Sequence, residues 1–436
     1  MLRSIRALIL FWTVFGSYGF GWPLSLLLGK ERGGRFLNRL HKKNARRLAR
    51  GFSKLRGVFI KMGQVLSVTG TFLPPAYGEA LAELQDKVPP RPFPEIEGRL
   101  REAFGADPLA RFGSFDPEPI AAASLAQVHR GTTRGGLAVA VKVLYPHIER
   151  LIAADLRVLR SVMPVIQLLA PIGRVERMLD QLEAMLARET DYSHERQNME
   201  RMRAVFAARS DVVIPTVIDE LTSGGVLTMS FEEGVKITDF EGQRGLGVDP
   251  EAVGKLLIEC YFEMLLRHRV FHADPHPGNF LVRSGPALVI LDYGAVEEVT
   301  PALAEGMKMV VMGALGKNDE LILRGLEHMG FVAEGGDREL LKNVGGEYLK
   351  VLSGVKIGDF SRLDREAIEK LSGFQQVRGR LRAVMKSVEY PDGYFYVERT
   401  LVLLFGLAGH LSPRQGLPGL VLPYAAQAFA GKKAPS

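Results

Sequence analysis

The segment from His272 to Gly294 holds the residue types best suited to chemistry. It reads His-Ala-Asp-Pro-His-Pro-Gly-Asn, then an apolar run, a Gly-Pro turn, a second apolar run and Asp-Tyr-Gly. Phosphoryl transfer needs a carboxylate beside the attacking hydroxyl and oxygen ligands that hold Mg²⁺ against the phosphates. Asp274 suits the first role, whereas Asn279 and Asp292 suit the second. Their spacing predicts that all three lie at one end of a β-hairpin.

The histidines of this segment suggest a competing metal site. His272 and His276 have the i, i+4 spacing of a helical ligand pair. Pro275 and Pro277 disfavour a helix there. We therefore expect phosphoryl-transfer chemistry rather than a histidine metal site.

A lysine in an apolar strand supplies a second part of the same chemistry. Lys142 follows Val139-Ala140-Val141, and a lysine placed there can pair with nucleotide phosphates while a helix carboxylate holds it. The candidate carboxylates are Glu189, Asp191 and Glu195, in one predicted helix segment. Three acids in so short a stretch are also typical of a solvated helix face, and the sequence leaves that alternative open.

Two features of ordinary protein kinases are missing from the sequence. No G-x-G-x-x-G precedes Lys142, and Pro119-Ile120-Ala121-Ala122-Ala123-Ser124 occupies the expected turn between the first strands. Alanines resist the positive φ and the close phosphate approach that glycines allow, so a nucleotide must be held differently. No Ala-Pro-Glu follows Asp292, and Thr300 is predicted to cap a helix soon after it, which leaves little room for a peptide-binding activation segment.

The elements that must position these residues alternate between strands and helices. We expect an α+β chain, because a group of strands precedes a largely helical region. The predicted strands are Gly113–Phe115, Ala126–His129, Ala138–Leu144, Val212–Ile214, Val226–Ser230, Phe280–Val282 and Ala287–Leu291. The predicted helices before the last two strands are Pro94–Phe104, His147–Ala170 and Val175–Phe206.

Charge divides the chain into two parts. Of its 436 residues, the first 61 hold 14 Lys or Arg and one acid, a net charge of +13 against +7 for the whole. The remainder is therefore mildly acidic. Composition excludes a disordered or collagen-like chain, and the lone Cys260 suits a reducing, cytosol-facing compartment.

The basic part begins with an apolar segment. Ala7–Gly29 carries no charge and is about long enough to span a bilayer, although glycines and Pro23 interrupt it. Spanning, interfacial, signal-peptide and buried-core roles all stay open. Leu37–Leu66 then predicts one long amphipathic helix with a basic opposite face, which favours contact with anionic lipid head groups. A solvated face is the alternative, and nucleic acid is not expected as a partner because no stacking aromatics interleave with these charges.

Together these motifs resemble the UbiB family of atypical, protein-kinase-like proteins. The resemblance rests on Lys61-Met62-Gly63-Gln64 as a K-x-G-Q motif, Ala121–Ser124 as an alanine-rich nucleotide loop, Glu189-Thr190-Asp191 as an E-x-D motif and His272–Asn279 as the catalytic loop. It implies a two-lobed kinase-like fold with an N-terminal helical extension and additional C-terminal helices. It also implies Mg²⁺ and ATP as cofactors.

The resemblance also implies roles for single residues. Lys61 and Gln64 would reach into the active site, while Glu189 and Asp191 would meet the extension. Glu195 is the better partner for Lys142, although Glu189 is not excluded. Met229 and Ser230 would lie at the adenine-binding hinge. The alanine-rich loop of Ala121, Ala122, Ala123 and Ser124 would also contact the nucleotide.

The motifs predict an atypical kinase or ATPase, and the resemblance implies that it supports isoprenoid-quinone (ubiquinone) biosynthesis. We expect it at the cytoplasmic face of the cell inner membrane. The rival hypotheses are a non-catalytic ATP-binding switch that extracts or presents lipid, and a Ser/Thr protein kinase. Expected partners are anionic lipids, quinone precursors or their biosynthetic enzymes, and a second copy in a homodimer. Gly416–Ser436 lacks the membrane-spanning helices of many bacterial relatives, so we expect anchoring through the N-terminus.

We expect four regions. They are an apolar segment over 1–29, a helical extension over 30–110, an N-lobe with inserted helices over 111–230 and a helical C-lobe over 231–436.

Overall fold

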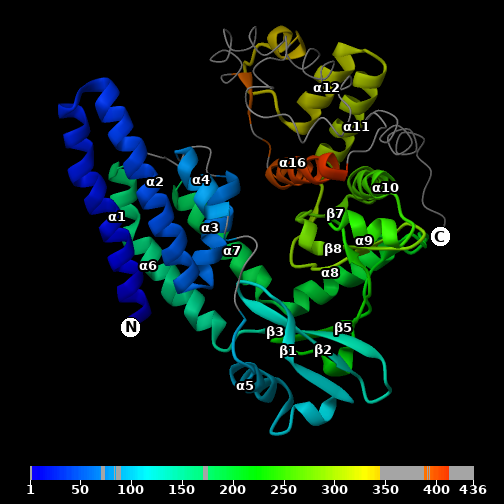
Figure 1. Cartoon of the computed structure of the whole chain (residues 1–436). Helices are drawn as coiled ribbons and strands as arrows, with labels where there is room; N and C mark the ends of the chain where they lie inside the picture. The colour runs from blue at the N-terminus through cyan, green and yellow to red at the C-terminus, as the bar shows by residue number, and fades with distance from the viewer. Residues whose placement is uncertain are drawn as a thin grey trace. The chain divides into compact units, whose positions relative to one another are not determined.

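The chain forms two compact units. The computed structural model describes residues 2–69, 74–82, 84, 90–169, 175–343, 387–389, 391 and 393–411 (Figure 1). The first unit comprises Met1–His194 and Val217–Phe231, and the second comprises Glu195–Thr216 and Glu232–Ser436. The four regions expected from the sequence stay a prediction, and Gly416–Ser436 lies outside the described residues.

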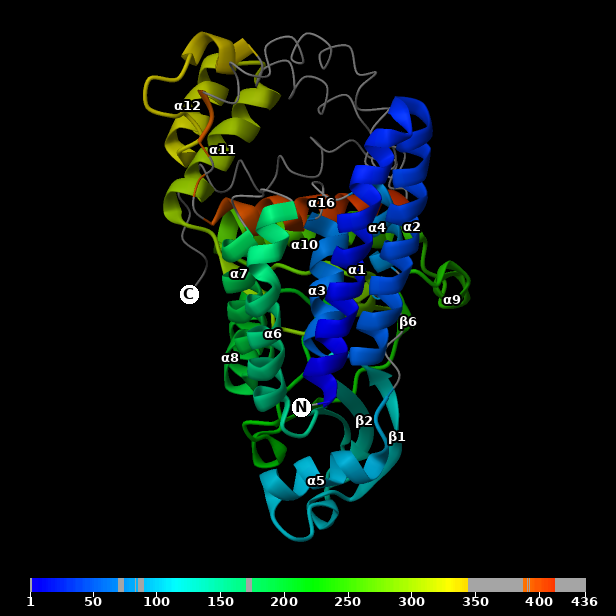
Figure 2. The same cartoon turned by 90° about the vertical axis from the view of Figure 1, so that its left-hand side faces the viewer.

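A helical hairpin opens the first unit. α1 (Leu2–Leu27) and α2 (Gly29–Leu55) lie side by side (Figure 2). Small residues allow the close approach, since a Cβ on Gly33 would overlap the carbonyl oxygen of Ser25. Pro23 lies inside α1 and does not end it, so the interruption expected there is not seen.

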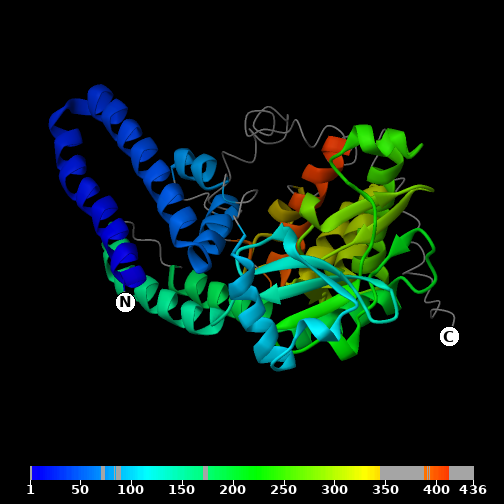
Figure 3. The same cartoon turned by 60° about the horizontal axis from the view of Figure 1, so that its bottom comes forward.

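α1 is apolar and mostly exposed. It is long and apolar enough to cross a membrane, and 22% of its most apolar stretch is buried in the protein. This low burial argues against a core helix. The start of α1 lies against α6 (Ile148–Leu169), where Arg3 pairs with the buried Asp155 (Figure 3).

The single helix predicted over Leu37–Leu66 is wrong. α2 ends at Leu55, and α3 (Val58–Thr69) starts after a break. Arg56 and Gly57 have φ values of 58° and 55°, in the left-handed region that an α-helix cannot contain. Apolar periodicity continues across this break, which is why the pattern did not reveal it. α4 (Pro75–Ala82) and α5 (Phe93–Phe104) follow, and α5 confirms the predicted helix there.

The first unit contains a four-stranded antiparallel sheet in the order β1-β2-β3-β5. Its strands are β1 (Ser114–Ala122), β2 (Ala126–Thr132), β3 (Ala138–Leu144) and β5 (Val226–Ser230). The predictions for β2, β3 and β5 are confirmed. In β3 the side chains of Val139, Val141 and Val143 are buried and Lys142 is part-exposed on the opposite face, as the pleat requires.

The expected position of the alanine-rich loop needs correction. Ala121 and Ala122 belong to β1, where they pair with Val128 and Gln127 of β2, and only Ala123 to Leu125 form the turn. β1 is an edge strand with irregular pairing around Pro119, and an edge strand tolerates proline because one side needs no ladder hydrogen bonds. The backbone of Ala121 and Ala122 is thus fixed by β-pairing.

The helix predicted over Val175–Phe206 is two helices. α7 (Val175–Glu189) ends at the E-x-D motif and α8 (Tyr192–Val205) begins just after it. Asp191 caps α8, since its Oδ1 accepts from the backbone N–H groups of Ser193 and His194 at 3.0 and 3.3 Å. Asp is among the preferred N-cap residues, and this capping explains why the helix restarts here.

The second unit is built on a mixed sheet in the order β4-β9-β8-β6 and a two-stranded pair of β7 with β10. The strands are β4 (Val212–Val213), β6 (Val235–Lys236), β7 (Val270–His272), β8 (Phe280–Arg283), β9 (Ala287–Ile290) and β10 (Val296–Glu298). The predictions for β4, β8 and β9 are confirmed within a residue or two. β6, β7 and β10 were not predicted, because two or three residues are too few to show a period.

Several helices accompany these strands in the second unit. They are α9 (Phe240–Gly245), α10 (Pro250–Phe262), a π-helical turn (Glu263–His268), α11 (Pro301–Leu315), α12 (Asp319–Met329) and α16 (Tyr394–Leu411). Thr300 caps α11 as predicted, with its hydroxyl accepting from the N–H of Leu303. Cys260, the lone cysteine, lies in α10 and is fully buried, and this burial raises the pKa of its thiol.

Candidate active site

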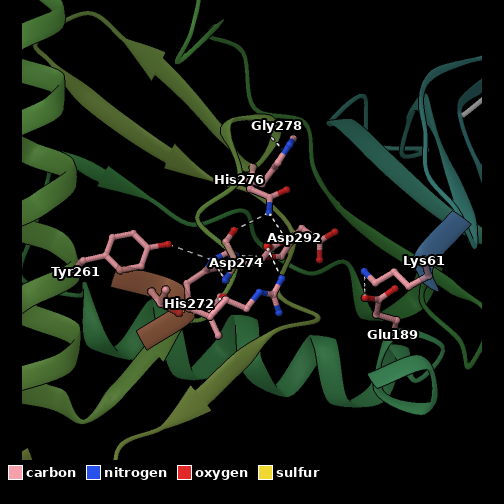
Figure 4. A network of polar contacts seen from close by, with 12 residues as sticks. Lys61, Glu189, Tyr261, His272, Asp274, His276, Gly278 and Asp292 are labelled. Atoms are coloured by element: carbon pink, nitrogen blue, oxygen red, sulfur yellow. Dashed lines mark hydrogen bonds and ion pairs between the residues drawn. The ribbon is translucent and has the colours of Figure 1, made fainter. Parts of the chain in front are cut away.

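A buried histidine organises the catalytic loop. His272 ends β7 and is 1% exposed. Its Nε2 lies 2.6 Å from the carbonyl oxygen of Asp292, and its Nδ1 lies 3.3 Å from the hydroxyl of Tyr261 (Figure 4). A carbonyl only accepts, so Nε2 carries the proton and Nδ1 is the acceptor. The Nδ1 atom can also accept from the N–H of Asp274, at 3.4 Å. One imidazole thus links the loop of Asp274 to the turn of Asp292.

Asp274 and Asn279 lie together at one end of the β8–β9 hairpin. The Asn279 amide donates to the carbonyl oxygen of Asp274 at 3.0 Å and lies 3.4 Å from its Oδ2. The backbone carbonyl of Asn279 accepts a hydrogen bond from the N–H of Leu291 at 2.8 Å, and this bond joins the loop to the end of β9. The expectation that Asp274, Asn279 and Asp292 meet at one end of a hairpin is therefore confirmed. Their chemical roles stay predictions.

Asp292 has an unusual backbone conformation directly after the second hairpin strand. Its φ is 58°, in the left-handed region, which Asp and Asn tolerate better than most other residues. Its Oδ1 accepts from the N–H of Gly294 at 3.1 Å. The carboxylate is thus oriented by its own turn.

Helix α8 holds this turn from behind. The Glu195 carboxylate accepts from the N–H of Tyr293 at 3.3 Å, and the Asn198 amide donates to the Tyr293 carbonyl at 2.9 Å. All three side chains are buried. Burial, with the nearby carboxylates of Glu195 and Asp292, raises the pKa of the Tyr293 phenol, whose hydroxyl donates to the Ile290 carbonyl at 2.6 Å. Glu195 therefore has a structural contact that its predicted role did not include.

The first unit carries the other predicted residues. Lys142 places its Nζ 5.5 Å from the centre of the Tyr192 ring, a cation–π distance. Lys142 and Glu195 belong to different units, so their pairing stays a prediction. Met229 and Ser230 pair with Ala140 and Val139 on the strand of Lys142, and their role at an adenine-binding hinge also stays a prediction.

The K-x-G-Q and E-x-D motifs meet within the first unit. Lys61, from α3, forms an ion pair with Glu189 at the end of α7 (Figure 4). Both side chains are largely buried, at 20% and 25% exposed. This contact fits the expectation that Glu189 meets the N-terminal extension. Asp191 instead caps α8, and Gln64 lies in α3 with a side chain outside the described set.

Three residues of the site were missed from the sequence. Tyr261 and Asn198 hold the catalytic loop and the Asp292 turn, but nothing in their neighbourhoods marks them. Arg399, from α16, lies 3.2 Å from Oδ1 of Asp274. A signal for it existed, because Glu398 and Arg399 interrupt an otherwise apolar helix.

The donor atoms here fit Mg²⁺ better than a histidine-bound metal. Asn279 uses its amide nitrogen toward Asp274, which leaves its Oδ1 as the acceptor, and Asp292 supplies carboxylate oxygen. Mg²⁺ favours a few such oxygen ligands together with substrate phosphates. His276 accepts from the N–H of Gly278 at 3.1 Å. Within the described ranges, no group of three His, Cys, Asp or Glu side chains could hold a metal.

Two curated relatives share much of this chain's sequence. A protein of Arabidopsis thaliana, "ACTIVITY OF BC1 COMPLEX KINASE 8, chloroplastic", is 30% identical over 89% of this chain and 54% of its own length. "AarF domain-containing protein kinase 1" of Xenopus tropicalis is 33% identical over 60% of this chain and 51% of its own. The chain thus spans about half the length of these curated relatives.

A solved structure extends the likeness to the fold. The Rv3197–erythromycin complex from Mycobacterium tuberculosis matches with a TM-score of 0.61 and 25% identity, over 89% of this chain and 97% of that one. The model of the ABC1 atypical kinase-like domain matches residues 83–325, which is more than half of the chain. The prediction of an α+β, kinase-like fold is confirmed, and this protein belongs to the UbiB/ABC1 family of atypical kinase-like proteins.

Proposed function

We propose that this protein is an atypical kinase or ATPase that uses Mg²⁺ and ATP. The observation that supports it best is the cluster of Asp274, Asn279 and Asp292 around the buried His272. When bound, Mg²⁺ would neutralise phosphate charge, with Asn279 and Asp292 as its protein ligands. Lys142 would position the phosphates.

The reaction in this proposal is an ordinary displacement. The acceptor oxygen, from a hydroxyl or from water, forms a bond to the γ-phosphorus as the bond from that phosphorus to the β,γ-bridging oxygen breaks. ADP leaves, and Asp274 accepts or orients the proton of the acceptor. Two hydrogen bonds hold Asp274 in place for this role. The side-chain amide of Asn279 donates to its carboxylate, and the backbone N–H of Asp274 donates to Nδ1 of His272.

The test compares three full-length variants. Asp292→Asn is expected to lose the rise in melting temperature that ATP and Mg²⁺ give to the native protein, and Asp274→Asn to lose ATP turnover while keeping that rise. Asp249→Asn is the matched control, because Asp249 caps α10 and Asn is an equally good cap. An unchanged thermal shift in Asp292→Asn would remove Asp292 from the metal site.

We also propose that the α1–α2 hairpin attaches the protein to an anionic membrane. Near the end of α1, Phe20, Leu26 and Leu27 are 85%, 73% and 85% exposed. α2 carries a surface groove lined by basic side chains, which are Arg39, Lys42, Lys43, Arg46, Arg47, Arg50 and Lys54. An apolar tip followed by a basic helix matches the acyl region and the anionic head groups of a bilayer. The membrane we propose is the cell inner membrane, at its cytoplasmic face.

Intrinsic fluorescence can test this attachment directly, because both tryptophans of the chain, Trp12 and Trp22, lie in α1 and are exposed. Vesicles containing phosphatidylglycerol should shift the emission of these tryptophans to shorter wavelength, because the indole rings leave water. Vesicles of phosphatidylcholine alone should cause a smaller shift. Replacing Arg39 and Arg46 with glutamine should weaken binding about 30-fold, at about 1 kcal/mol per basic residue.

A control and a contrary outcome complete the vesicle test. Val402→Ser is the control, because Val402 is 65% exposed on α16, away from the hairpin sequence. If the double glutamine variant and the control bind equally well, the basic groove does not contact lipid.

The pathway we propose is isoprenoid-quinone biosynthesis, acting on quinone precursors or on their biosynthetic enzymes. The family resemblance supports this. Quinone profiling of cells that lack the protein, complemented with the native chain or with Asp274→Asn, tests it. Normal quinone levels in the deletion would refute the pathway, and normal levels with Asp274→Asn alone would favour an ATP-binding switch.

A further inference from the structure

Helix α16 places a cation on the carboxylate of Asp274. The Nη2 atom of Arg399 lies 3.2 Å from Oδ1 of Asp274, and both residues belong to the second unit. The next residue, Thr400, is fully buried and donates from its hydroxyl to the carbonyl of Ala273 at 3.2 Å. Two adjacent residues of α16 thus contact two adjacent residues of the catalytic loop.

Packing, rather than the ion pair, sets the position of Arg399. The buried residues of α16 recur at helical spacing along one face, and α16 packs against α10. They are Val397, Thr400, Leu404, Leu407, Ala408, Gly409 and Leu411. Arg399 borders this face, so it is held beside the loop even if its contact with Asp274 opens.

The ion pair itself contributes little to stability. The side chains of Arg399 and Asp274 are 27% and 33% exposed. Pairs with this much access to water stabilise proteins weakly. A contact that adds little to the fold, yet engages the proposed base, is better explained by function.

The contact occupies the atoms that an acceptor needs. Asp274 presents Oδ1 to Arg399 and Oδ2 toward the Asn279 amide. A hydroxyl or a water molecule that gives its proton to Asp274 must approach the same two oxygens. The guanidinium therefore competes with the acceptor for the carboxylate.

We propose that Arg399 is an autoinhibitory latch, which restrains Asp274 until the guanidinium moves away and an acceptor takes its place. Arg399 is a positioning residue, because it acts through Asp274. The inference rests on the proposed function of Asp274. It implies that α16 adjusts how readily the loop accepts a substrate.

The experiment measures ATP turnover at saturating and limiting ATP for the full-length native protein, Arg399→Gln, Arg399→Lys and Asp274→Asn. Glutamine removes the charge, so kcat should rise, by up to about fivefold if the pair has the strength usual at partly exposed sites. The KM for ATP should stay unchanged, since the latch acts on the acceptor side. Arg399→Lys keeps the charge without the planar fork and should give an intermediate kcat.

Matched controls separate the possible failures. Arg324→Gln, on the exposed face of α12, should leave kcat and KM unchanged. If Asp274→Asn abolishes ATP turnover and Arg399→Gln leaves kcat unchanged or lowers it, the latch is overturned. The proposed function of Asp274 then still stands. Absence of turnover in both the native protein and Arg399→Gln overturns the enzymatic function and the latch together. If Arg399→Gln does not fold, Arg399→Lys decides by the same comparison.

Discussion

Replacing Arg3 with methionine should destabilise the protein strongly for a residue so near the chain start. Arg3 donates to Oδ1 and Oδ2 of Asp155 at 2.9 and 2.5 Å, and also to the carbonyls of Leu55 and Arg56 at the end of α2. The Asp155 side chain is 1% exposed and that of Arg3 is 27% exposed. One guanidinium thus joins α1, the end of α2 and α6.

The expected loss follows from the burial of Asp155. Removing one partner of a buried ion pair costs about 3 to 5 kcal/mol, and the partial exposure of Arg3 places the expected value near the lower end, at about 3 kcal/mol. Burial raises the pKa of Asp155, and the hydrogen bond and charge of Arg3 oppose that rise. The pKa of Asp155 is higher in the folded protein than in the unfolded chain, so the protonated side chain favours folding. The free energy of unfolding therefore falls as the pH rises through the pKa of the folded state and Asp155 ionises. The loss in Arg3→Met should therefore shrink at acidic pH, where Asp155 takes up a proton.

Urea unfolding followed by tryptophan fluorescence is the appropriate assay, since Trp12 and Trp22 both report on α1. Arg6→Met is the control, because Arg6 is exposed one turn away. The double variant Arg3→Met/Asp155→Leu should recover most of the lost free energy of unfolding, because it leaves no buried charge. Equal stability of Arg3→Met and the control, or no recovery in the double variant, would refute this reasoning.

Three further predictions concern stability. Burial opposes ionisation of Glu263, but hydrogen bonds from His268 and Arg209 outweigh it and lower the pKa of this carboxyl below 4.5. Its stabilisation is therefore present at neutral pH and lost on acidification, so urea titrations should show the deficit of Glu263→Gln shrinking below about pH 4.5. Gly306→Val should lower the free energy of unfolding by about 1 to 3 kcal/mol, measured by thermal unfolding, because a Cβ there would lie 2.6 Å from a carbonyl oxygen of the facing α12. Gly98→Ala is the control, because space is open around Gly98 and no such loss is expected. Asp191→Ala should cost about 1 kcal/mol through loss of the α8 cap, and Asp191→Ser should retain most of it.

The catalytic loop could be predicted from the sequence because its chemistry is local. Asp274, Asn279 and Asp292 lie within one hairpin, whose strands and turn have clear signals, and the structure places them together. The strand of Lys142 was equally clear, because its alternating valines are buried on one face. Short range and strong periodicity made these features readable.

The remaining features depend on contacts that local patterns do not contain. The break at Arg56 needs a left-handed backbone in a residue other than glycine, and the apolar stripe runs through it unchanged. Arg399 contacts a residue 125 positions away, so only the folded chain reveals the pairing. Ala121 and Ala122 carry no strand signal of their own, and their place in β1 follows from pairing with β2.

The left-handed backbone of Asp292 restricts which side chains can occupy that position. Asparagine tolerates this conformation nearly as well as aspartate, and glycine adopts it freely, whereas glutamate pays more for it despite its identical charge. Replacement by asparagine therefore isolates the charge, while the apparently milder change to glutamate would disturb the turn that Tyr293 and Gly294 complete. A residue at this position must satisfy two requirements, the left-handed backbone and the carboxylate ligand for Mg²⁺. Aspartate satisfies both, so fewer substitutions should be tolerated here than at a position with only one of these requirements.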